Sequence, residues 1–332
     1  MPKLFILGSG FSKAVFQNEM PLMKEFTNCI EAELNKFPDK FPPHSVYRKF
    51  GTDVEGLLTY LYQEIPWRQD YDSIHDESLL LKLLDCIGEY IAECEKNAFA
   101  KQAPPSWVNQ FVKYIHDKEI TVATFNYDTI LERLSKDLIR NADVNRSIYR
   151  IPISPLSHRA STGVRWQDLG TILSDTYRLL KLHGSINWYF TRDENLSGAP
   201  VYCSYIDEDP NDTSFIINKM GLKPLIIPPI AEKAPFYGIQ LVKILWAELK
   251  KAVDDADEIY CVGYSLPKSD YTTQIFFSTV INKDKRKVYI VNKKCGSDDL
   301  IKNYKEALPN CELITDYVTD DKPVAKMVGD LK

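Results

Sequence analysis

Polar or glycine residues follow five apolar segments of the chain, at the points where those segments stop. They are GSGFS after KLFIL, TFNYD after ITVA, HGS after YRLLKL, VGYS after EIYC, and VN after KVYI. In α/β proteins, ligands bind at the carboxyl ends of parallel strands, where backbone amides and a helix N-terminus can face a phosphate. Five such ends on one edge of a single sheet therefore predict a nucleotide-binding site.

The first of these strand ends carries small residues. Gly8, Ser9 and Gly10 follow KLFIL, and a glycine backbone lets a pyrophosphate approach closely. The dinucleotide fingerprint GxGxxG is incomplete, because Lys13 occupies its third glycine position and no acidic strand end follows about twenty residues later. The alternative is a glycine turn that serves chain reversal only.

Two further strand ends carry side chains suited to ribose chemistry. Thr124, Asn126 and Asp128 can hydrogen-bond a ribose and its pyrophosphate, although Asn126 or Asp128 could instead cap the following helix. His183 ends an apolar strand, and the glycine after it allows a turn that presents the imidazole as a general base for a hydroxyl. The alternative for His183 is a structural histidine with satisfied hydrogen bonds.

The last two strand ends carry Gly263 and Ser265, and then Asn292, which suit adenosine and phosphate contacts.

The sequence motifs of several other classes of site are absent: the chain has no GxSxG, no HExxH, no GxxxxGK followed by Ser or Thr, and no EF-hand spacing. Its seven cysteines include no CxxC pair, which excludes a zinc knuckle and a thioredoxin-type redox pair.

The elements that must position these residues alternate between strands and helices of about a dozen residues, which implies βαβ units and a parallel sheet. We expect an α/β fold: a doubly wound, Rossmann-like, mostly parallel sheet with a large helical insertion after the first strand. The expected division is a nucleotide-binding α/β domain at 1–20 and 119–318, a helical module at 21–118, and a C-terminal tail at 319–332.

Composition narrows the class of protein further. With 332 residues, 44% of them hydrophobic and 26% charged, the chain can bury a sizeable core. A formal net charge of -5 argues against a dedicated polyanion binder, so no direct nucleic-acid binding is evident. The odd number of cysteines, the short apolar run at the start and the lack of a membrane-length apolar run together predict a soluble, cytoplasmic protein with no membrane partner.

The five segments, in this order, resemble the sirtuin superfamily. GSGFS is similar to its GAGIS or GAGVS loop, TFNYD to its TQNID segment, and LHGS to the HG that bears its catalytic histidine. VGYS is similar to its GTS, and VN to its final ribose-contacting VN. The resemblance spans residues 4 to about 295, although few positions within that span carry it.

The resemblance implies roles for individual residues. Asn126, Asp128 and His183 would be catalytic: the first two hold the nicotinamide-side ribose and its neighbourhood, and His183 is the base that acts on a ribose hydroxyl. The residues that bind NAD+ would be Gly8, Ser9, Gly10, Phe11, Ser12, Thr124, Gly263, Ser265 and Asn292.

Two departures from the family pattern narrow the expected activity. Sirtuin deacylases place four zinc-binding cysteines between the histidine and the GTS strand, whereas Cys203 is the sole cysteine in that interval apart from Cys261 inside the strand. We therefore expect NAD+ as the substrate and no zinc. The loop that carries a PDFR signature in sirtuin deacylases reads MPLMKEF here, which keeps Pro21 but lacks the Asp-Phe-Arg that should follow it. The residue that replaces the signature's carboxylate near the nicotinamide amide is therefore unassigned.

This pattern resembles the zinc-less sirtuin-like NAD+ hydrolases of bacterial anti-phage defence. It implies an NAD+ glycohydrolase that cleaves NAD+ to nicotinamide and ADP-ribose and depletes NAD+ in infected cells. The alternatives are an NAD-dependent deacylase or ADP-ribosyltransferase, and a non-catalytic nucleotide-binding sensor. We also expect a homo-oligomer, a partner protein such as an ATPase or an Argonaute-type sensor, or both.

Overall fold

The computed structural model describes residues 2–17, 19–22, 25–36, 48–63, 67, 70–139, 142–158, 173–191, 200–205, 212–228, 230, 233–293, 297–319 and 321–331. The sequence predicts irregular structure at 37–52, 141–176 and 195–222, and parts of these segments lie outside the described residues.

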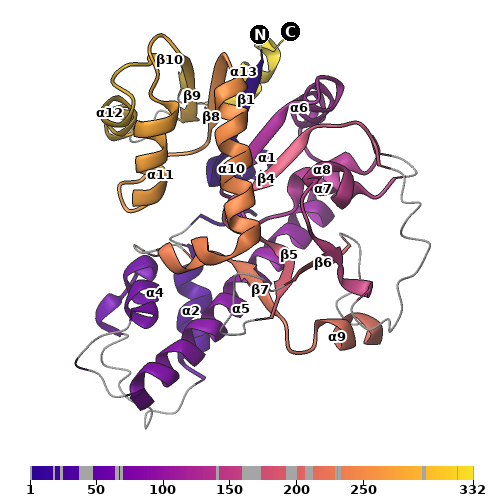
Figure 1. The fold of residues 1–332 in the computed structure, drawn as a ribbon, viewed down its shortest axis with the longest axis vertical. Coiled ribbons are helices and arrows are strands. Elements are labelled where there is room, and N and C mark those ends of the chain that lie inside the picture. Colours follow the sequence, from indigo (N-terminus) through magenta and orange to yellow (C-terminus); the bar gives the residue numbers. More distant parts are fainter. Residues whose placement is uncertain are drawn as a thin grey trace.

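A six-stranded sheet occupies the upper part of the molecule in Figure 1. In spatial order its strands are β10 (Glu312–Thr319), β9 (Lys287–Lys293), β8 (Glu258–Val262), β1 (Lys3–Leu7), β2 (Thr121–Thr124) and β4 (Arg178–Lys181). Each pairing between neighbours is parallel. The chain builds outward from β1 through β2 and β4 on one side, then through β8, β9 and β10 on the other. The expected doubly wound, Rossmann-like α/β fold is thereby confirmed.

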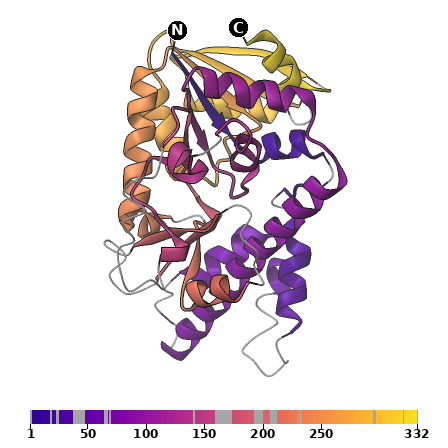
Figure 2. The same cartoon turned by 90° about the vertical axis from the view of Figure 1, so that its right-hand side faces the viewer.

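Helices cover both faces of this sheet. Figure 2 shows α10 (Gln240–Asp255) on one side, and α6 (Ser106–Asp117) with α13 (Pro323–Asp330) on the other. The Phe111 ring of α6 packs edge-on against Phe5 of β1, with ring centroids 5.1 Å apart. Both chain termini lie at the same end of the sheet.

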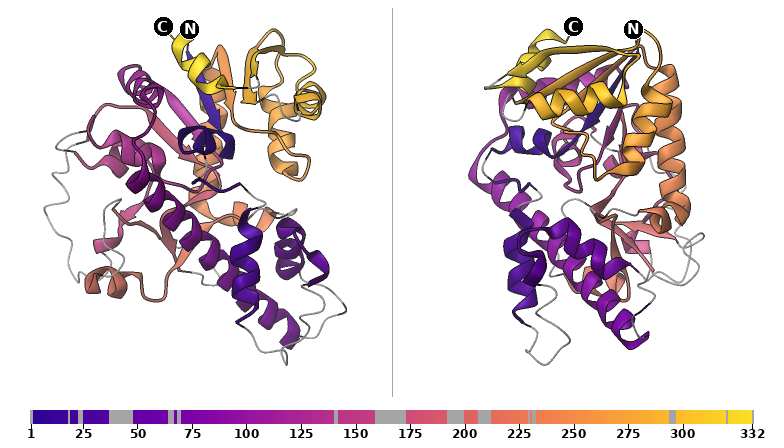
Figure 3. Two further views of the ribbon diagram at one scale, coloured as in Figure 1. Left: turned by 180° about the vertical axis from the view of Figure 1, so that it is seen from behind. Right: turned by 90° about the vertical axis from the view of Figure 1, so that its left-hand side faces the viewer.

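The segment between β1 and β2 is helical, as expected, but it divides in two. It contains α1 (Ser9–Val15), α2 (Phe26–Leu34), η2 (Arg48–Phe50), α4 (Val54–Tyr62), α5 (Asp70–Lys101) and α6. Helices α2, α4 and α5 pack on one another and form what we call the helical lobe, with α5 running from it towards the sheet (Figure 3). The last helix, α6, packs on the sheet instead, because its apolar face meets β1 and α13.

A second sheet lies beside the helical lobe. Its strands are β3 (Ser154–Pro155), β6 (Val201–Cys203), β5 (Gly184–Phe190) and β7 (Lys223–Ile226), in that spatial order. The apolar segment PLIIPP has the pattern of a buried strand, and it contributes β7, which pairs antiparallel with β5. Helix α9 (Thr213–Lys219) packs against η3 (Leu156–His158) and closes a small apolar cluster there.

The remaining described helices are short or flank the main sheet. They are α7 (Ile130–Ser135), α8 (Val144–Tyr149), η5 (Ala234–Gly238), α11 (Tyr271–Phe276), η6 (Phe277–Ile281) and α12 (Ser297–Ala307). The segment expected as a C-terminal tail contains α13. It packs on the sheet because Val324, Met327 and Val328, at helical spacing, are all buried. Within the described residues, none of the helices combines the length and apolar character that crossing a membrane requires.

Candidate active site

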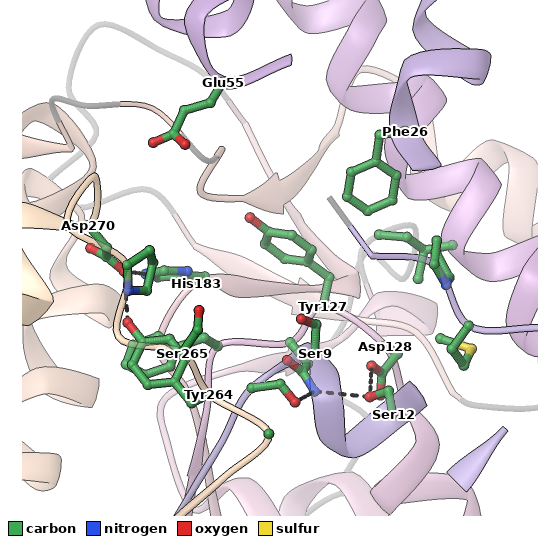
Figure 4. A pocket seen from close by; sticks show the side chains of 18 of the residues that line it. Ser9, Ser12, Phe26, Glu55, Tyr127, Asp128, His183, Tyr264, Ser265 and Asp270 are labelled. Carbon is green, nitrogen blue, oxygen red and sulfur yellow. Dashed lines mark hydrogen bonds and ion pairs between the residues drawn. The ribbon is translucent and has the colours of Figure 1, made fainter. Parts of the chain in front are cut away.

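A cavity of about 310 Å³ opens at the carboxyl ends of β1, β2, β4 and β8. This is the point where the strand order reverses, since the chain leaves β1 and β8 in opposite directions along the sheet, and open α/β sheets bind ligands there. The lining residues are Gly8, Ser9, Ser12, Met20, Pro21, Phe26, Glu55, Ile91, Phe125, Asn126, Tyr127, Asp128, His183, Lys233, Gly263, Tyr264, Ser265, Pro267, Ser269 and Asp270. The helical lobe supplies Phe26, Glu55 and Ile91, so lobe and sheet together enclose the cavity (Figure 4).

Most of the site residues expected from the sequence meet in this cavity. Gly8, Ser9, Ser12, Asn126, Asp128, His183, Gly263 and Ser265 all line it. Four others do not. Thr124 is buried in β2, and Phe11 packs its ring against Trp107 and Phe111. Gly10 faces the turn after β8, and the Asn292 side chain accepts a hydrogen bond from the next backbone amide on β9.

Asn126 is held by the segment that follows β1 and by the end of its own strand, β2. Its Nδ2 donates to the carbonyl oxygen of Gly8 at 3.0 Å and to Oγ of Ser12 at 2.9 Å. Its backbone amide donates to Oγ1 of Thr124 at 3.0 Å, which explains why a threonine outside the cavity still matters to the site. Both amide donors are used on protein groups, so the side-chain carbonyl is the group that remains for a ligand.

Asp128 sits beside this network. Oγ of Ser12 donates to one carboxylate oxygen at 2.6 Å, and the backbone amide of Ile130 donates to the other at 3.3 Å. Asp128 thus accepts a hydrogen bond from the first amide of α7 while it lines the cavity, although the N-cap residue of that helix is Thr129, whose side chain makes no capping bond. Burial raises the pKa of Asp128 to about 6; Lys181 opposes this rise and the charge of Glu95 adds to it. The carboxylate is therefore mostly ionised at pH 7 and partly protonated below pH 6.

The raised pKa predicts a pH-dependent stability. Because the folded-state pKa exceeds the ordinary value of 3.8, ionising Asp128 opposes folding, and the free energy of unfolding falls as the pH rises from about 4 to 6. Asp128→Asn removes this pH-dependent part of the free energy of unfolding. It amounts to at most about 3 kcal/mol, since each unit of pKa shift corresponds to about 1.4 kcal/mol and solvent in the cavity weakens the effect. Urea unfolding of both proteins at pH 4.5 and pH 7 measures it. Equal changes with pH in the two proteins would contradict the expectation.

His183 reaches the cavity through a tight junction between β4 and β5. Gly184, at φ +80°, follows it, and a Cβ there would collide with the carbonyl oxygen of Leu225 on β7. The imidazole packs against the Phe125 ring with centroids 4.9 Å apart, and the residue is 7% exposed. Burial, and after it the charge of Lys233, lower the pKa of His183 to about 3, while Asp270 opposes them only in part. The imidazole is therefore neutral at pH 7, with a lone pair that can accept a proton.

The glycines at the strand ends serve packing as well as access. The sequence suggested that they admit a pyrophosphate, but a Cβ on Gly8 would meet the Gly263 carbonyl oxygen at 2.7 Å. A Cβ on Gly10 would meet Cα of Gly263 at the same distance. The turns after β1 and β8 thus lie backbone to backbone, which positions Ser9 and Ser265 at the same cavity.

We expect Gly263→Ala to destabilise the protein by about 3 kcal/mol, since alanine would have to adopt φ +62° and its Cβ would collide with the amide nitrogen of Phe11. Gly51→Ala is the matched control: its φ is +51°, but open space surrounds it, so about 1 kcal/mol is expected. Chemical denaturation of the two variants measures the difference. Equal losses would show that the contact between the turns contributes nothing.

Several cavity residues were not found from the sequence. Lys233 precedes η5, Asp270 precedes α11 and Glu55 lies on α4, so each comes from a segment without a recognisable motif. Asp270 did carry one signal, because an aspartate just before a helix predicts an N-cap, and its Oδ1 does face the amide of Thr273. Nothing in the sequence, however, indicates that it lies beside His183.

Cys203, the one cysteine between His183 and β8, has a structural role. Cys203 is buried in β6, where its sulfur accepts hydrogen bonds from Asn145 and Asn187, each at 3.3 Å. In the part of the chain that the structure describes, no three His, Cys, Asp or Glu side chains gather in a way that could hold a metal ion. The expectation that the protein uses no zinc stays a prediction.

Comparison with known proteins gives structural neighbours only. No family model and no curated protein matches the sequence. Among solved structures, two variants of a Sir2 homologue in complex with ADP-ribose match at 12% identity. One has a TM-score of 0.44 and covers 98% of this chain and 92% of its own; the other has a TM-score of 0.40 and covers 99% and 90%. A structure described as the basis for the mechanism and regulation of Sir2 enzymes matches at 13% identity, with a TM-score of 0.38 and coverage of 99% and 91%.

Proposed function

We propose that this protein is an NAD+ glycohydrolase, which converts NAD+ and water to nicotinamide, ADP-ribose and a proton. One observation carries the proposal: a fixed amide, Asn126, and a neutral, buried imidazole, His183, line the same cavity at the strand-order reversal. Such a pair can orient a ribose or an attacking water and accept a proton from it. The resemblance of the five strand-end motifs to sirtuins supplies NAD+ as the substrate.

The charges around the cavity suit the nicotinamide half of NAD+. Three carboxylates line it, from Glu55, Asp128 and Asp270, against one lysine, Lys233. This balance favours a pyridinium cation over a phosphate. The diphosphate would then lie at the turn between β1 and α1, next to Gly8 and Ser9. A volume of about 310 Å³ is at the lower end for small-molecule sites, which is consistent with a cavity that holds the reacting half of the substrate.

The reaction needs one bond broken and one formed. The bond between C1′ of the ribose and the ring nitrogen breaks, its electron pair neutralises the pyridinium, and nicotinamide leaves. The positive charge that develops on the ribose is stabilised by the ionised carboxylate of Asp128, which Ser12 holds in place. The oxygen of a water positioned by Asn126 bonds to C1′, and its proton passes to His183 and then to solvent.

Chromatography of nicotinamide and ADP-ribose after incubation with NAD+, with and without an acyl-lysine peptide, tests this proposal. We expect equal amounts of both products without the peptide. Nicotinamide formed only with the peptide, together with O-acyl-ADP-ribose, would identify a deacylase. ADP-ribose attached to a protein would identify a transferase. Tight NAD+ binding without cleavage under every condition would identify a nucleotide sensor.

The cellular role rests on the resemblance to anti-phage hydrolases alone. We propose a cytoplasmic effector that depletes NAD+ and is activated by self-assembly or by a partner such as an ATPase or an Argonaute-type protein. The division into an NAD-binding domain and a helical module is part of this proposal, with the helical lobe as the contact surface. Light scattering of the purified protein, alone and with candidate partners, measures assembly; a monomer that is fully active alone would contradict it.

A further inference from the structure

Three ionisable side chains form a buried row on one wall of the cavity. Nε2 of His183 lies 3.8 Å from Oδ2 of Asp270, and Nζ of Lys233 lies 2.9 Å from Oδ1 of the same carboxylate. All three residues are less than a tenth exposed. Each comes from a different segment: the β4–β5 junction, the end of the β8–α11 connection, and the residue before η5. The charges of the buried lysine and aspartate cancel, so the row carries no net charge while the histidine is neutral.

One nitrogen atom in this row, Nε2 of His183, lacks a hydrogen-bond partner among the described residues. Nε2 of His183 is buried and makes no hydrogen bond among the described residues, because 3.8 Å is too long for one. A buried polar atom without a partner is costly, and such atoms in native proteins call for an explanation. The nearest carboxylate oxygen is Oδ2 of Asp270, the one not paired with Lys233.

The surroundings fix both partners of the contact. Phe125 packs against the imidazole and stacks on Tyr264 with centroids 4.5 Å apart, and the Tyr264 hydroxyl donates to Oδ2 of Asp270 at 3.4 Å. Asp270 is also the N-cap of α11. Figure 4 shows His183 between Asp270 on one side and Tyr127 on the cavity side. The imidazole and the carboxylate are therefore held side by side, and a hydrogen bond between them needs only a separation shorter than 3.8 Å.

We propose that Asp270 is a positioning residue for His183: its carboxylate accepts a hydrogen bond from the N–H at Nε2, so that Nδ1 keeps the lone pair that serves as the base. This inference rests on the proposed function. Lys233 keeps the carboxylate ionised. Hydrogen bonds of catalytic groups are often long without a ligand and shorten when the substrate binds, as the 3.8 Å separation requires here. The arrangement follows the logic by which an aspartate selects the tautomer of a catalytic histidine in hydrolytic triads.

The charges that face His183 predict how its titration responds to substitution. Asp270 lies beside the imidazole, and Lys233 pairs with Asp270. Glu55 on α4 and Asp128 after β2 are the other carboxylates that line the cavity. Lys233 lowers the pKa of His183 and Asp270 raises it. Lys233→Met should therefore raise this pKa, whereas Asp270→Asn should lower it. A residue that acts only as a helix cap would give no such opposite response.

NMR of protein labelled with ¹⁵N-histidine tests the inference without substrate. The five histidines are distinguished by comparison with a His183→Gln spectrum. We expect His183 to be protonated at Nε2 in the wild type and to lose that preference in Asp270→Asn. Asparagine keeps the N-cap of α11, and Asp143→Asn, the same change at the N-cap of α8, is the matched control with no expected effect on His183.

Activity supplies the second readout. Asp270→Asn should lower kcat for NAD+ cleavage about 10²-fold or more with little change in KM, and Asp270→Glu should recover part of the loss. A wild-type His183 protonated at Nδ1, or an Asp270→Asn variant with unchanged tautomer and kcat, would overturn the inference. The expected tautomers in a protein that never cleaves NAD+ would instead overturn the proposed function.

Discussion

Asn126→Ala is expected to lower kcat for NAD+ cleavage by about 10²- to 10³-fold, the usual cost of removing one positioned polar group from a transition state. The structure gives two reasons. The side-chain carbonyl is the one cavity-facing group of Asn126 that no protein group needs, and its amide connects the carbonyl oxygen of Gly8 to Oγ of Ser12. Removing it therefore releases the hydroxyl that holds Asp128. Steady-state kinetics of nicotinamide release measure the effect.

Two further variants sharpen this result. Asn126→Asp should be as inactive as Asn126→Ala, because a carboxylate cannot donate to the Gly8 carbonyl oxygen and would repel Asp128. Asn282→Ala is the matched control, since the Asn282 side chain accepts a hydrogen bond from the backbone of Asn310, away from the cavity, and should leave kcat unchanged. Activity of Asn126→Ala within a few-fold of the wild type would contradict a catalytic role for the amide.

His183→Gln is expected to lower kcat by about 10²- to 10⁴-fold, the range for loss of a general base, with little change in KM. Glutamine has a similar shape but cannot accept and release a proton at neutral pH. The wild-type base is neutral at pH 7 because burial and Lys233 hold the pKa of His183 at about 3, so its protonation state does not limit the rate near neutrality.

The control for this variant is His116→Gln. His116 lies on α6, where its Nδ1 bonds the Thr176 hydroxyl at 2.8 Å, and it does not line the cavity. Its replacement should leave kcat unchanged. If His183→Gln and His116→Gln showed the same rate as the wild type at matched thermal stability, the imidazole of His183 would have no part in the chemistry.

Much of the site was predictable because strand ends are visible in the sequence. Apolar runs that stop at glycine or short polar residues predicted β1, β2, β4 and β8, and in a parallel sheet their carboxyl ends must meet at one edge. That reasoning correctly predicted that Asn126, Asp128 and His183 lie at one site. Asn292 does not line the cavity, because β9 lies one strand beyond the reversal point, and its expected contact with the adenosine half stays a prediction.

The rest depended on tertiary packing that local patterns do not encode. Glu55 and Phe26 reach the cavity because the helical lobe folds back over the sheet edge, and nothing in α2 or α4 indicates that direction. The strand β7 pairs with β5 rather than with the main sheet, a choice that short apolar segments leave open. By contrast, α13 was predictable, since Val324, Met327 and Val328 have helical spacing, but the segment was interpreted as a tail.

Cleavage of NAD+ by the purified wild type and by Asn126→Ala and His183→Gln, followed as nicotinamide and ADP-ribose in the absence of any acyl-lysine peptide, is the most direct test of the proposed hydrolase. The site described above predicts equal amounts of the two products from the wild type and a loss of both in each variant. Undiminished cleavage in either variant, or nicotinamide release that requires an acyl-lysine peptide, would contradict it.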